Sequence, residues 1–189
     1  MGRVEDAVIY AAKKHNGQVR KIGKIPYIIH PLEVASIIAT MTGDEDIIIA
    51  GILHDIVEDT DTSADEVREL FGDRVCSIVS SETENKYRDQ KAEDTWKKRK
   101  EESLKLLSET DDEGVRILWL ADKLANLRSM YRNYRDMGDA VWDHFHQKDP
   151  MMHKWYFTEV ARLVEPDLKD KAAYMEYCWI LDRFWGGSK

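Results

Sequence analysis

The sequence predicts an all-α fold in a single domain. Three observations support this: amphipathic segments recur along the chain, helix-start and helix-stop residues bound them, and no repeat, low-complexity tract or linker interrupts the pattern. With 189 residues and a hydrophobic content of 43%, the chain can bury a sizeable core. We therefore expect one helical bundle over residues 1–189.

The first predicted helix spans residues 4–15 and precedes a basic loop. Its inward face is predicted to hold four apolar residues, Val4, Val8, Ala11 and Ala12. Gly17 and Pro26 interrupt helical structure in the loop that follows. The next helix is predicted over residues 31–41, because proline is favoured in a first helical turn. His30 lies just before it and is either a structural histidine or a metal ligand.

The stretch 47–60 carries most of the chemistry in the sequence. Its apolar run, Ile47 to Leu53, leads directly into His54-Asp55, and Glu58-Asp59 follow one turn later. A Thr-x-x-Glu capping box at residues 42–45 favours a helix over residues 47–55, and a buried strand is the alternative. On a continuous helix, residues four apart share a face, so His54 would lie over Glu58.

Shorter helices are predicted over residues 64–71, 74–82 and 95–108. Thr62 or Ser63 can cap the first of these, and Gly72 ends it. The polar segment that begins at residue 81 predicts a mobile loop near the mouth of a site. The basic run at residues 97–100 either binds phosphates or forms a solvated helix face.

A long helix is predicted from Thr110 through Met130, with Asp122 inside its apolar pattern. A buried carboxylate costs several kcal/mol unless it is paired or binds a metal. Pairing with Lys123 cannot be assumed, because adjacent helical residues point in different directions. The remaining helices are predicted over residues 138–146, 151–164 and 168–185, with Pro150 and Pro166 as breaks.

The composition excludes several classes of function. A net charge of −8 argues against nucleic-acid binding, and no apolar run approaches the roughly 20 residues of a membrane span. Cys76 and Cys178 predict no disulfide framework, and we expect a cytoplasmic protein. His144 and His146 are predicted to be surface residues. Six C-terminal aromatic residues are expected to be core or to support a homodimer: Trp155, Tyr156, Phe157, Trp179, Phe184 and Trp185.

Three segments in order, RKIGKIPYIIHPLEVA, LHDIVEDT and LADKLANLRSM, resemble the metal-dependent HD hydrolase superfamily. Within it, the chain is most similar to the hydrolase domain of the RelA/SpoT alarmone enzymes, especially the small hydrolases related to metazoan SpoT homologue. The resemblance is strongest over residues 11–130 and implies an HD-domain helical bundle, with further helices over residues 138–185.

The resemblance also implies roles for individual residues. The implied metal ligands are His30, His54, Asp55 and Asp122, with Mn²⁺ as the expected ion, although zinc or iron(II) also suits this ligand set. Glu58 and Asp59 would be the catalytic acids that activate or orient water. Arg20 and Lys21 would line the phosphate side, while Asn126 and Ser129 would lie near the base and ribose.

The implied reaction is hydrolysis of ppGpp or pppGpp at the 3′ position, releasing pyrophosphate and GDP or GTP. The alternatives are another phosphohydrolase activity, such as removal of the 2′-phosphate of NADPH, a non-catalytic nucleotide sensor, or a structural interaction module. The chain length leaves no room for a synthetase domain. Ala125 replaces a usual histidine, Ser129 replaces a common threonine, and residues 81–100 follow the alarmone pattern only in part.

Overall fold

The fold is an arrangement of helices joined by turns, seen in a computed structural model that describes residues 2–84, 87 and 89–186. The first six helices are α1 (Arg3–Lys14), α2 (Ile29–Ala39), α3 (Glu45–Leu53), α4 (Ile56–Asp59), α5 (Ala64–Phe71) and α6 (Asp73–Glu82). The others are α7 (Ala92–Glu109), α8 (Glu113–Met137), the 3₁₀ helix η1 (Gly138–His144), α9 (Pro150–Leu168) and α10 (Ala172–Trp185). Within the described ranges no strand forms, and the predicted all-α class is confirmed.

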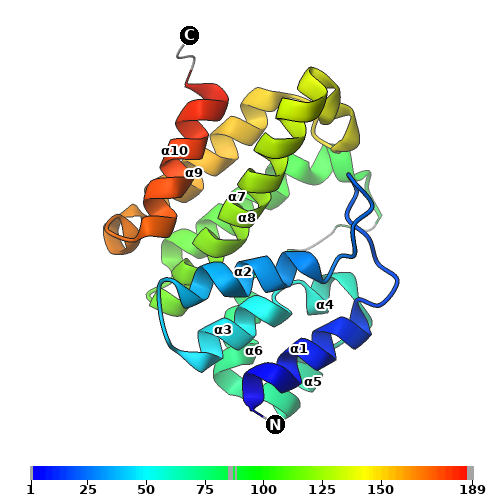
Figure 1. Cartoon of the computed structure of the whole chain (residues 1–189), viewed down its shortest axis with the longest axis vertical. Helices are drawn as coiled ribbons and strands as arrows, with labels where there is room; N and C mark the ends of the chain where they lie inside the picture. Colours follow the sequence, from blue (N-terminus) through cyan, green and yellow to red (C-terminus); the bar gives the residue numbers. More distant parts are fainter. Residues whose placement is uncertain (1, 85–86, 88, 187–189) are drawn as a thin grey trace.

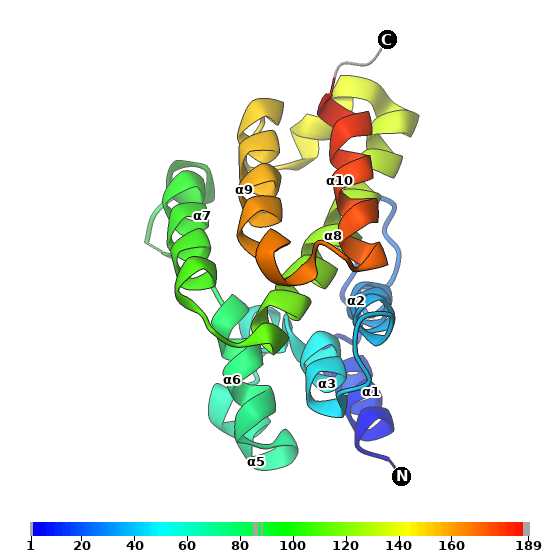
Figure 2. The same ribbon diagram turned by 90° about the vertical axis from the view of Figure 1, so that its left-hand side faces the viewer.

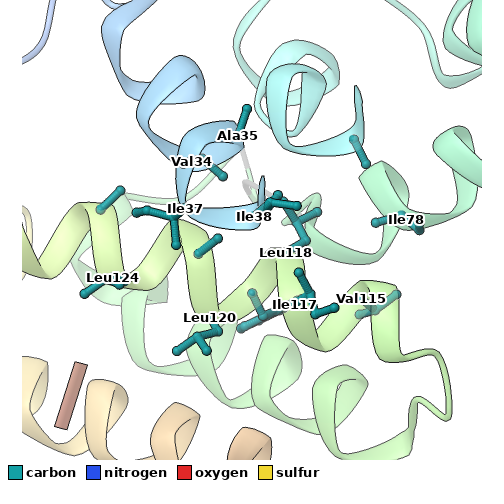
Figure 3. Packing of buried hydrophobic residues seen from close by; sticks show 14 of the residues in the cluster. Val34, Ala35, Ile37, Ile38, Ile78, Val115, Ile117, Leu118, Leu120 and Leu124 are labelled. Atoms are coloured by element: carbon teal, nitrogen blue, oxygen red, sulfur yellow. The ribbon is translucent and has the colours of Figure 1, made fainter. Parts of the chain in front are cut away.

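Helix α8 connects the two ends of the molecule. At one end lie α1, α3, α5 and α6, and at the other α8 packs against η1, α9 and α10 (Figures 1 and 2). Helix α2 crosses both α3 and α8, and apolar residues of α2 and α8 face one another in the core (Figure 3). This crossing brings three segments that are far apart in sequence to one place.

The α2–α3 crossing depends on a glycine. A Cβ atom at Gly51 would lie 2.4 Å from Ile38 Cδ1 and 3.5 Å from Ala35 Cα, so a side chain there would force the helices apart. The close approach places the first turn of α2 beside the end of α3. His30 is in that first turn, because α2 begins at Ile29 and not at Pro31 as predicted.

The predicted continuous helix through His54-Asp55 is wrong. Helix α3 ends at Leu53, a turn holds residues 54 and 55, and α4 begins at Ile56. The N-cap of α3 also differs from the prediction: Asp44, and not Thr42, accepts a hydrogen bond from the Asp46 N–H. Asp44 is closer to the first turn, so it can take the capping position that the sequence pattern gave to Thr42.

Other boundaries agree more closely with the predictions. Ser63 caps α5, and Gly72 ends it with a φ of +98°. Helix α1 buries Ala7 and Ala11, whereas Ala12 is exposed. The segment predicted as a loop is shorter than expected, because α6 extends to Glu82 and α7 begins at Ala92. Part of that prediction, residues 85, 86 and 88, lies outside the described residues.

The C-terminal part follows the predicted order with different breaks. Pro166 lies inside α9, near its end, where the loss of one backbone hydrogen bond is tolerated, and α10 begins four residues later than predicted, at Ala172. Tyr156 and Phe157 are buried, and Trp179 is 55% exposed. Most of the six aromatic residues therefore pack in or against the core, as expected.

Three further predictions from the sequence can be compared with the structure: those on membrane spans, on the cysteines and on two histidines. In the described part of the chain, no helix combines the length and apolar character needed to cross a bilayer. Cys76 is buried and Cys178 half-buried, and both are free thiols. His144 and His146 are exposed, as predicted.

Candidate metal centre

Side chains from three separate segments come together near the place where α2 packs against α3 and α8. His30 comes from α2, His54 and Asp55 from the turn after α3, and Asp122 from the middle of α8. His30 Nε2 lies 2.9 Å from Asp122 Oδ1 and 3.6 Å from Asp55 Oδ2. His54 Nε2 lies 2.9 Å from Asp55 Oδ2 and 3.4 Å from Asp122 Oδ1. We call these four residues the metal cluster.

The ring of His54 is oriented to present a lone pair. Its Nδ1 lies 2.8 Å from the Gly51 carbonyl oxygen, which can only accept, so Nδ1 carries a hydrogen. In the neutral ring, Nε2 then carries a lone pair and faces two carboxylates, and it is buried with no hydrogen-bond partner among the described residues. Three acceptor groups, from His30, His54 and Asp122, lie within 4.8 Å of one another. A divalent cation fits this arrangement, because it would supply the missing positive charge.

The ionisation of the metal-cluster residues also favours a bound cation. Burial opposes the ionised form of Asp122, but Lys123 and the two imidazoles hold its pKa well below the usual range. His54 and His30 likewise hold the pKa of Asp55 low against burial. Burial disfavours a charged imidazole, yet the two carboxylates raise the pKa of His54 well above its usual value. The carboxylates therefore stay ionised and stabilise positive charge between them, as a proton or as a bound cation.

Asp122 has more partners than the sequence predicted. Lys123 Nζ donates to Asp122 Oδ2 at 2.6 Å, although the two residues are adjacent. The long lysine side chain reaches its neighbour, so the pairing that the sequence alone could not establish is present. Asn126 Nδ2 donates to the other oxygen, Asp122 Oδ1, at 2.8 Å. Asp122 is therefore held in a fixed orientation toward the two histidines.

The metal cluster opens onto a cavity of about 960 Å³. Of the predicted site residues, nine line this cavity, namely Arg20, Lys21, His30, Asp55, Glu58, Asp59, Asp122, Asn126 and Ser129. His54, the remaining one, lies buried behind Asp55 and Asp122. The structure thus brings together every residue that the sequence assigned to the site.

Two of the predicted substrate-binding residues contact each other across the cavity. Arg20 Nη2 donates to Asn126 Oδ1 at 3.1 Å, and its guanidinium lies 5.7 Å from the centre of the Tyr27 ring. Because Asn126 also bonds Asp122, Arg20 is linked through one amide to the metal cluster. A guanidinium at this place is suited to hold a phosphate beside a cation.

The basic run at residues 97–100 has two different faces. Lys97 and Lys98 are exposed, whereas Arg99 and Lys100 line the cavity. Arg99 Nη1 and Lys100 Nζ donate to Glu84 at 2.7 and 2.5 Å. The predicted solvated face is therefore present at Lys97 and Lys98, whereas Arg99 and Lys100 lie in the cavity wall, where phosphate binding stays a prediction.

The sequence did not reveal several other residues of the wall. Lys123 Nζ donates to Glu82 Oε1 at 2.7 Å, and the other Glu82 oxygen is buried with no hydrogen-bond partner within the described ranges. Burial raises the pKa of Glu82 to about 7, against the opposing effect of Lys123. The negative charge of the neighbouring Asp122 also raises the pKa of Glu82. We call Glu82, Glu84, Arg99, Lys100 and Lys123 the ion-pair cluster.

Comparison with known proteins places this site in a family. Residues 7–152 match the pattern of the HD domain. A guanosine-3′,5′-bis(diphosphate) 3′-pyrophosphohydrolase from Aquifex aeolicus is 39% identical over 131 residues, which cover 68% of this chain and 18% of that protein. A GTP pyrophosphokinase from Myxococcus xanthus is 36% identical over 129 residues, covering 67% of this chain and 17% of that protein. The chain spans less than a fifth of the length of these relatives.

Two solved structures share the fold. One is a metazoan orthologue of SpoT, described as hydrolysing ppGpp and acting in starvation responses, with a TM-score of 0.75, 24% identity, and coverage of 98% of this chain and 97% of that one. The other is the lmo0812 protein of Listeria monocytogenes, with a TM-score of 0.71, 30% identity, and coverage of 85% and 96%. The matched pattern covers most of the sequence, so the chain belongs to the HD-domain family and is related to the HD domains of SpoT/Rel proteins.

Proposed function

We propose that the chain hydrolyses ppGpp and pppGpp at the 3′ position, with a divalent cation, expected to be Mn²⁺, as cofactor. The observation that carries this proposal is the convergence of His30, His54, Asp55 and Asp122 on one wall of a cavity that is large enough for a nucleotide. The relationship to HD domains of alarmone enzymes supports the choice of substrate.

In the proposed reaction, water attacks the phosphorus that is bonded to the ribose 3′-oxygen. That P–O bond breaks, and pyrophosphate leaves from GDP or GTP. A bound divalent cation would lower the pKa of water and polarise a phosphoryl oxygen. We assign the cation to the metal cluster, because its unpartnered His54 nitrogen and two ionised carboxylates suit a cation.

The acidic pair next to the metal cluster has a separate role in the proposal. Glu58 and Asp59 lie on α4, one turn beyond Asp55, and both line the cavity. A carboxylate within hydrogen-bond reach of water can take its proton and return one to the leaving oxygen. We assign that proton transfer to Glu58 and Asp59.

Basic and polar groups on the other side would hold the nucleotide. Arg20 and Lys21 supply positive charge for the diphosphate, and Asn126 and Ser129 supply polar contacts from α8 for ribose or base. Ala125, where related enzymes commonly have histidine, is buried and does not line the cavity, so its replacement leaves the proposed contacts in place.

The test is a substrate panel. The purified chain with Mn²⁺ is incubated separately with ppGpp, pppGpp, NADPH and deoxynucleoside triphosphates, with chelator-treated protein as the control. We expect pyrophosphate and GDP or GTP from the first two. Orthophosphate from NADPH, with no product from ppGpp, would overturn the proposal in favour of a 2′-phosphatase.

A pair of variants distinguishes an enzyme from a nucleotide sensor. Glu58→Gln and Asp59→Asn remove the proposed proton-transfer groups and keep the size of each side chain. In an enzyme, turnover falls while nucleotide binding survives. Binding without turnover in the wild-type chain would favour a sensor. Light scattering tests separately whether the C-terminal aromatic residues support a homodimer.

A further inference from the structure

The loop between α1 and α2 makes one contact with the turn that holds Asp55 and one with α4, the helix that carries Glu58 and Asp59. Tyr27 Oη donates to Asp55 Oδ2 at 2.5 Å, the length of a strong hydrogen bond to a carboxylate. Gln18 Nε2 donates to the backbone carbonyl of Asp59 at 2.8 Å. One contact thus reaches a proposed metal ligand, and the other reaches the proposed catalytic pair.

Tyr27 and Gln18 are held next to each other by a backbone hydrogen bond and by contacts with His15. The Tyr27 N–H donates to the Gln18 carbonyl oxygen at 2.9 Å, next to the isolated bridge between Val19 and Pro26. His15 Nδ1 donates to Gln18 Oε1 at 2.8 Å, and its ring centre lies 5.0 Å from that of Tyr27. His15 follows α1 directly and is only 3% exposed, so both contacts are anchored on the end of a packed helix.

The chemistry of each donor suits a fixed contact. Burial and the Asp55 carboxylate raise the pKa of Tyr27, so its hydroxyl keeps the hydrogen that it donates. The oxygen that it contacts, Asp55 Oδ2, is the one nearest to the imidazoles of His30 and His54. Both polar atoms of the Gln18 side-chain amide are hydrogen-bonded, because the oxygen accepts from His15 while the nitrogen donates to the Asp59 carbonyl oxygen.

We propose that Tyr27 and Gln18 are positioning residues with separate tasks: Tyr27 orients Asp55 for the metal, and Gln18 fixes the backbone that carries Glu58 and Asp59. The task of Gln18 rests on the proposed hydrolytic function. The task of Tyr27 concerns metal affinity and can be tested without any substrate. Hydrogen bonds to a ligating carboxylate typically change metal affinity by roughly 10–100-fold.

The first test is Mn²⁺ binding to the full chain by isothermal titration calorimetry. Tyr27→Phe should weaken Mn²⁺ binding by at least about tenfold. Tyr10→Phe is the matched control, because Tyr10 also donates its hydroxyl hydrogen to a carboxylate, Glu66, at 2.6 Å, away from the cavity. The control should bind Mn²⁺ within about twofold of the wild type.

The second test separates the two tasks. Gln18→Met keeps the length of the side chain but removes its donor, so we expect Mn²⁺ affinity within about twofold of the wild type and a kcat for ppGpp roughly tenfold lower at a similar KM. Amide hydrogen exchange should accelerate in residues 56–60 and stay unchanged in α8. Thermal unfolding of each variant shows that it is folded.

Three results would overturn the inference. The first is a folded Tyr27→Phe that binds Mn²⁺ as the wild type does. The second is an equal loss of affinity in Tyr10→Phe, which would indicate a general packing effect. The third is a Gln18→Met with unchanged exchange in residues 56–60. If wild-type protein binds Mn²⁺ but does not cleave ppGpp, the proposed function fails, while the Tyr27 and exchange measurements still decide the inference.

Discussion

The metal cluster and the ion-pair cluster share one cavity wall but differ in how their charges are balanced. In the ion-pair cluster, Arg99 and Lys100 donate to Glu84, and Lys123 donates to Glu82, at 2.5–2.7 Å. In the metal cluster, two carboxylates face two imidazoles, and His54 Nε2 has no hydrogen-bond partner in the part of the chain that the structure describes. Lys123 is the link, because it also donates to Asp122.

The difference explains why buried charge alone does not identify a metal site. Glu84 is a half-buried carboxylate whose charge is already compensated by two cationic side chains. Among the described residues, one lysine, Lys123, pairs with Asp122 and none pairs with Asp55, so the metal cluster stabilises added positive charge. Changes in the metal cluster should therefore affect cation binding and turnover, and changes in the ion-pair cluster should mainly affect stability and its pH dependence.

The largest expected effect follows from replacing His54 by glutamine. This change removes the unpartnered nitrogen, and with it the proposed cation. Metal polarisation of a phosphoryl group supplies several kcal/mol, which corresponds to a loss of roughly 10³-fold in kcat/KM for ppGpp. The same substitution at exposed His144 is the control and should leave the rate within about twofold. A His54→Gln variant within tenfold of wild-type activity would contradict the assignment.

The next effect is stabilisation by the cation itself. A ligand that binds only the folded state at 100 times its Kd stabilises that state by about 2.7 kcal/mol. For a chain of this size, that amounts to a rise in Tm of roughly 5–10 °C, measured by scanning calorimetry with Mn²⁺ and with chelator. Glu84→Gln should keep this rise, and His54→Gln should lose it. An equal rise in both variants would place the cation outside the metal cluster.

A smaller effect distinguishes the two acids of the ion-pair cluster by pH. The pKa of Glu82 is raised to about 7 from its ordinary 4.5, so between these values the folded state binds more protons and rising pH weakens folding. Glu82→Gln removes this penalty. The free energy of unfolding of Glu82→Gln, measured relative to wild type, should therefore increase by about 1–3 kcal/mol as the pH is raised from 5 to 8.

Glu84→Gln is the matched control, because the pKa of Glu84 is shifted in the opposite direction to that of Glu82. Lys100 and Arg99 hold the pKa of Glu84 below its usual range despite burial, so its contribution is complete above pH 4.5. Urea unfolding at pH 5, 6.5 and 8 should therefore show a constant cost for Glu84→Gln. A constant difference for Glu82→Gln over the same range would show that Glu82 is ionised throughout.

The two clusters also differ in how well the sequence predicted them. All four residues of the metal cluster follow from three short motifs, because His30, His54-Asp55 and Asp122 lie in local patterns that resemble a known family. Their convergence agrees with that prediction, even though the helix around His54 is interrupted. A break of two residues leaves the path of the chain nearly helical, so the error did not displace the site.

The ion-pair cluster could not be predicted, because it depends on tertiary contacts. Lys123 and Glu82 are 41 residues apart, and nothing near Glu82 marks it as buried. The sequence also left the pairing of Lys123 with Asp122 open, because helical geometry describes the Cβ direction and not the reach of a lysine. The positions of Gln18 and Tyr27 likewise depend on how the loop between α1 and α2 packs against residues 54–59.

The smallest expected effect tests whether the basic run at residues 97–100 has two functional faces. Lys97 is exposed and pairs with Glu101 at 3.6 Å, an ion pair of a kind worth about 0.3–0.5 kcal/mol. Lys97→Met should change the free energy of unfolding by no more than about 0.5 kcal/mol and leave the KM for ppGpp within about twofold. The same substitution at Lys100 removes a partner of Glu84 and should cost about 1–3 kcal/mol, because a buried charge loses a donor. Equal costs at the two positions would mean that Glu84 does not depend on Lys100, and the distinction between a solvated face and a cavity wall within α7 would fail.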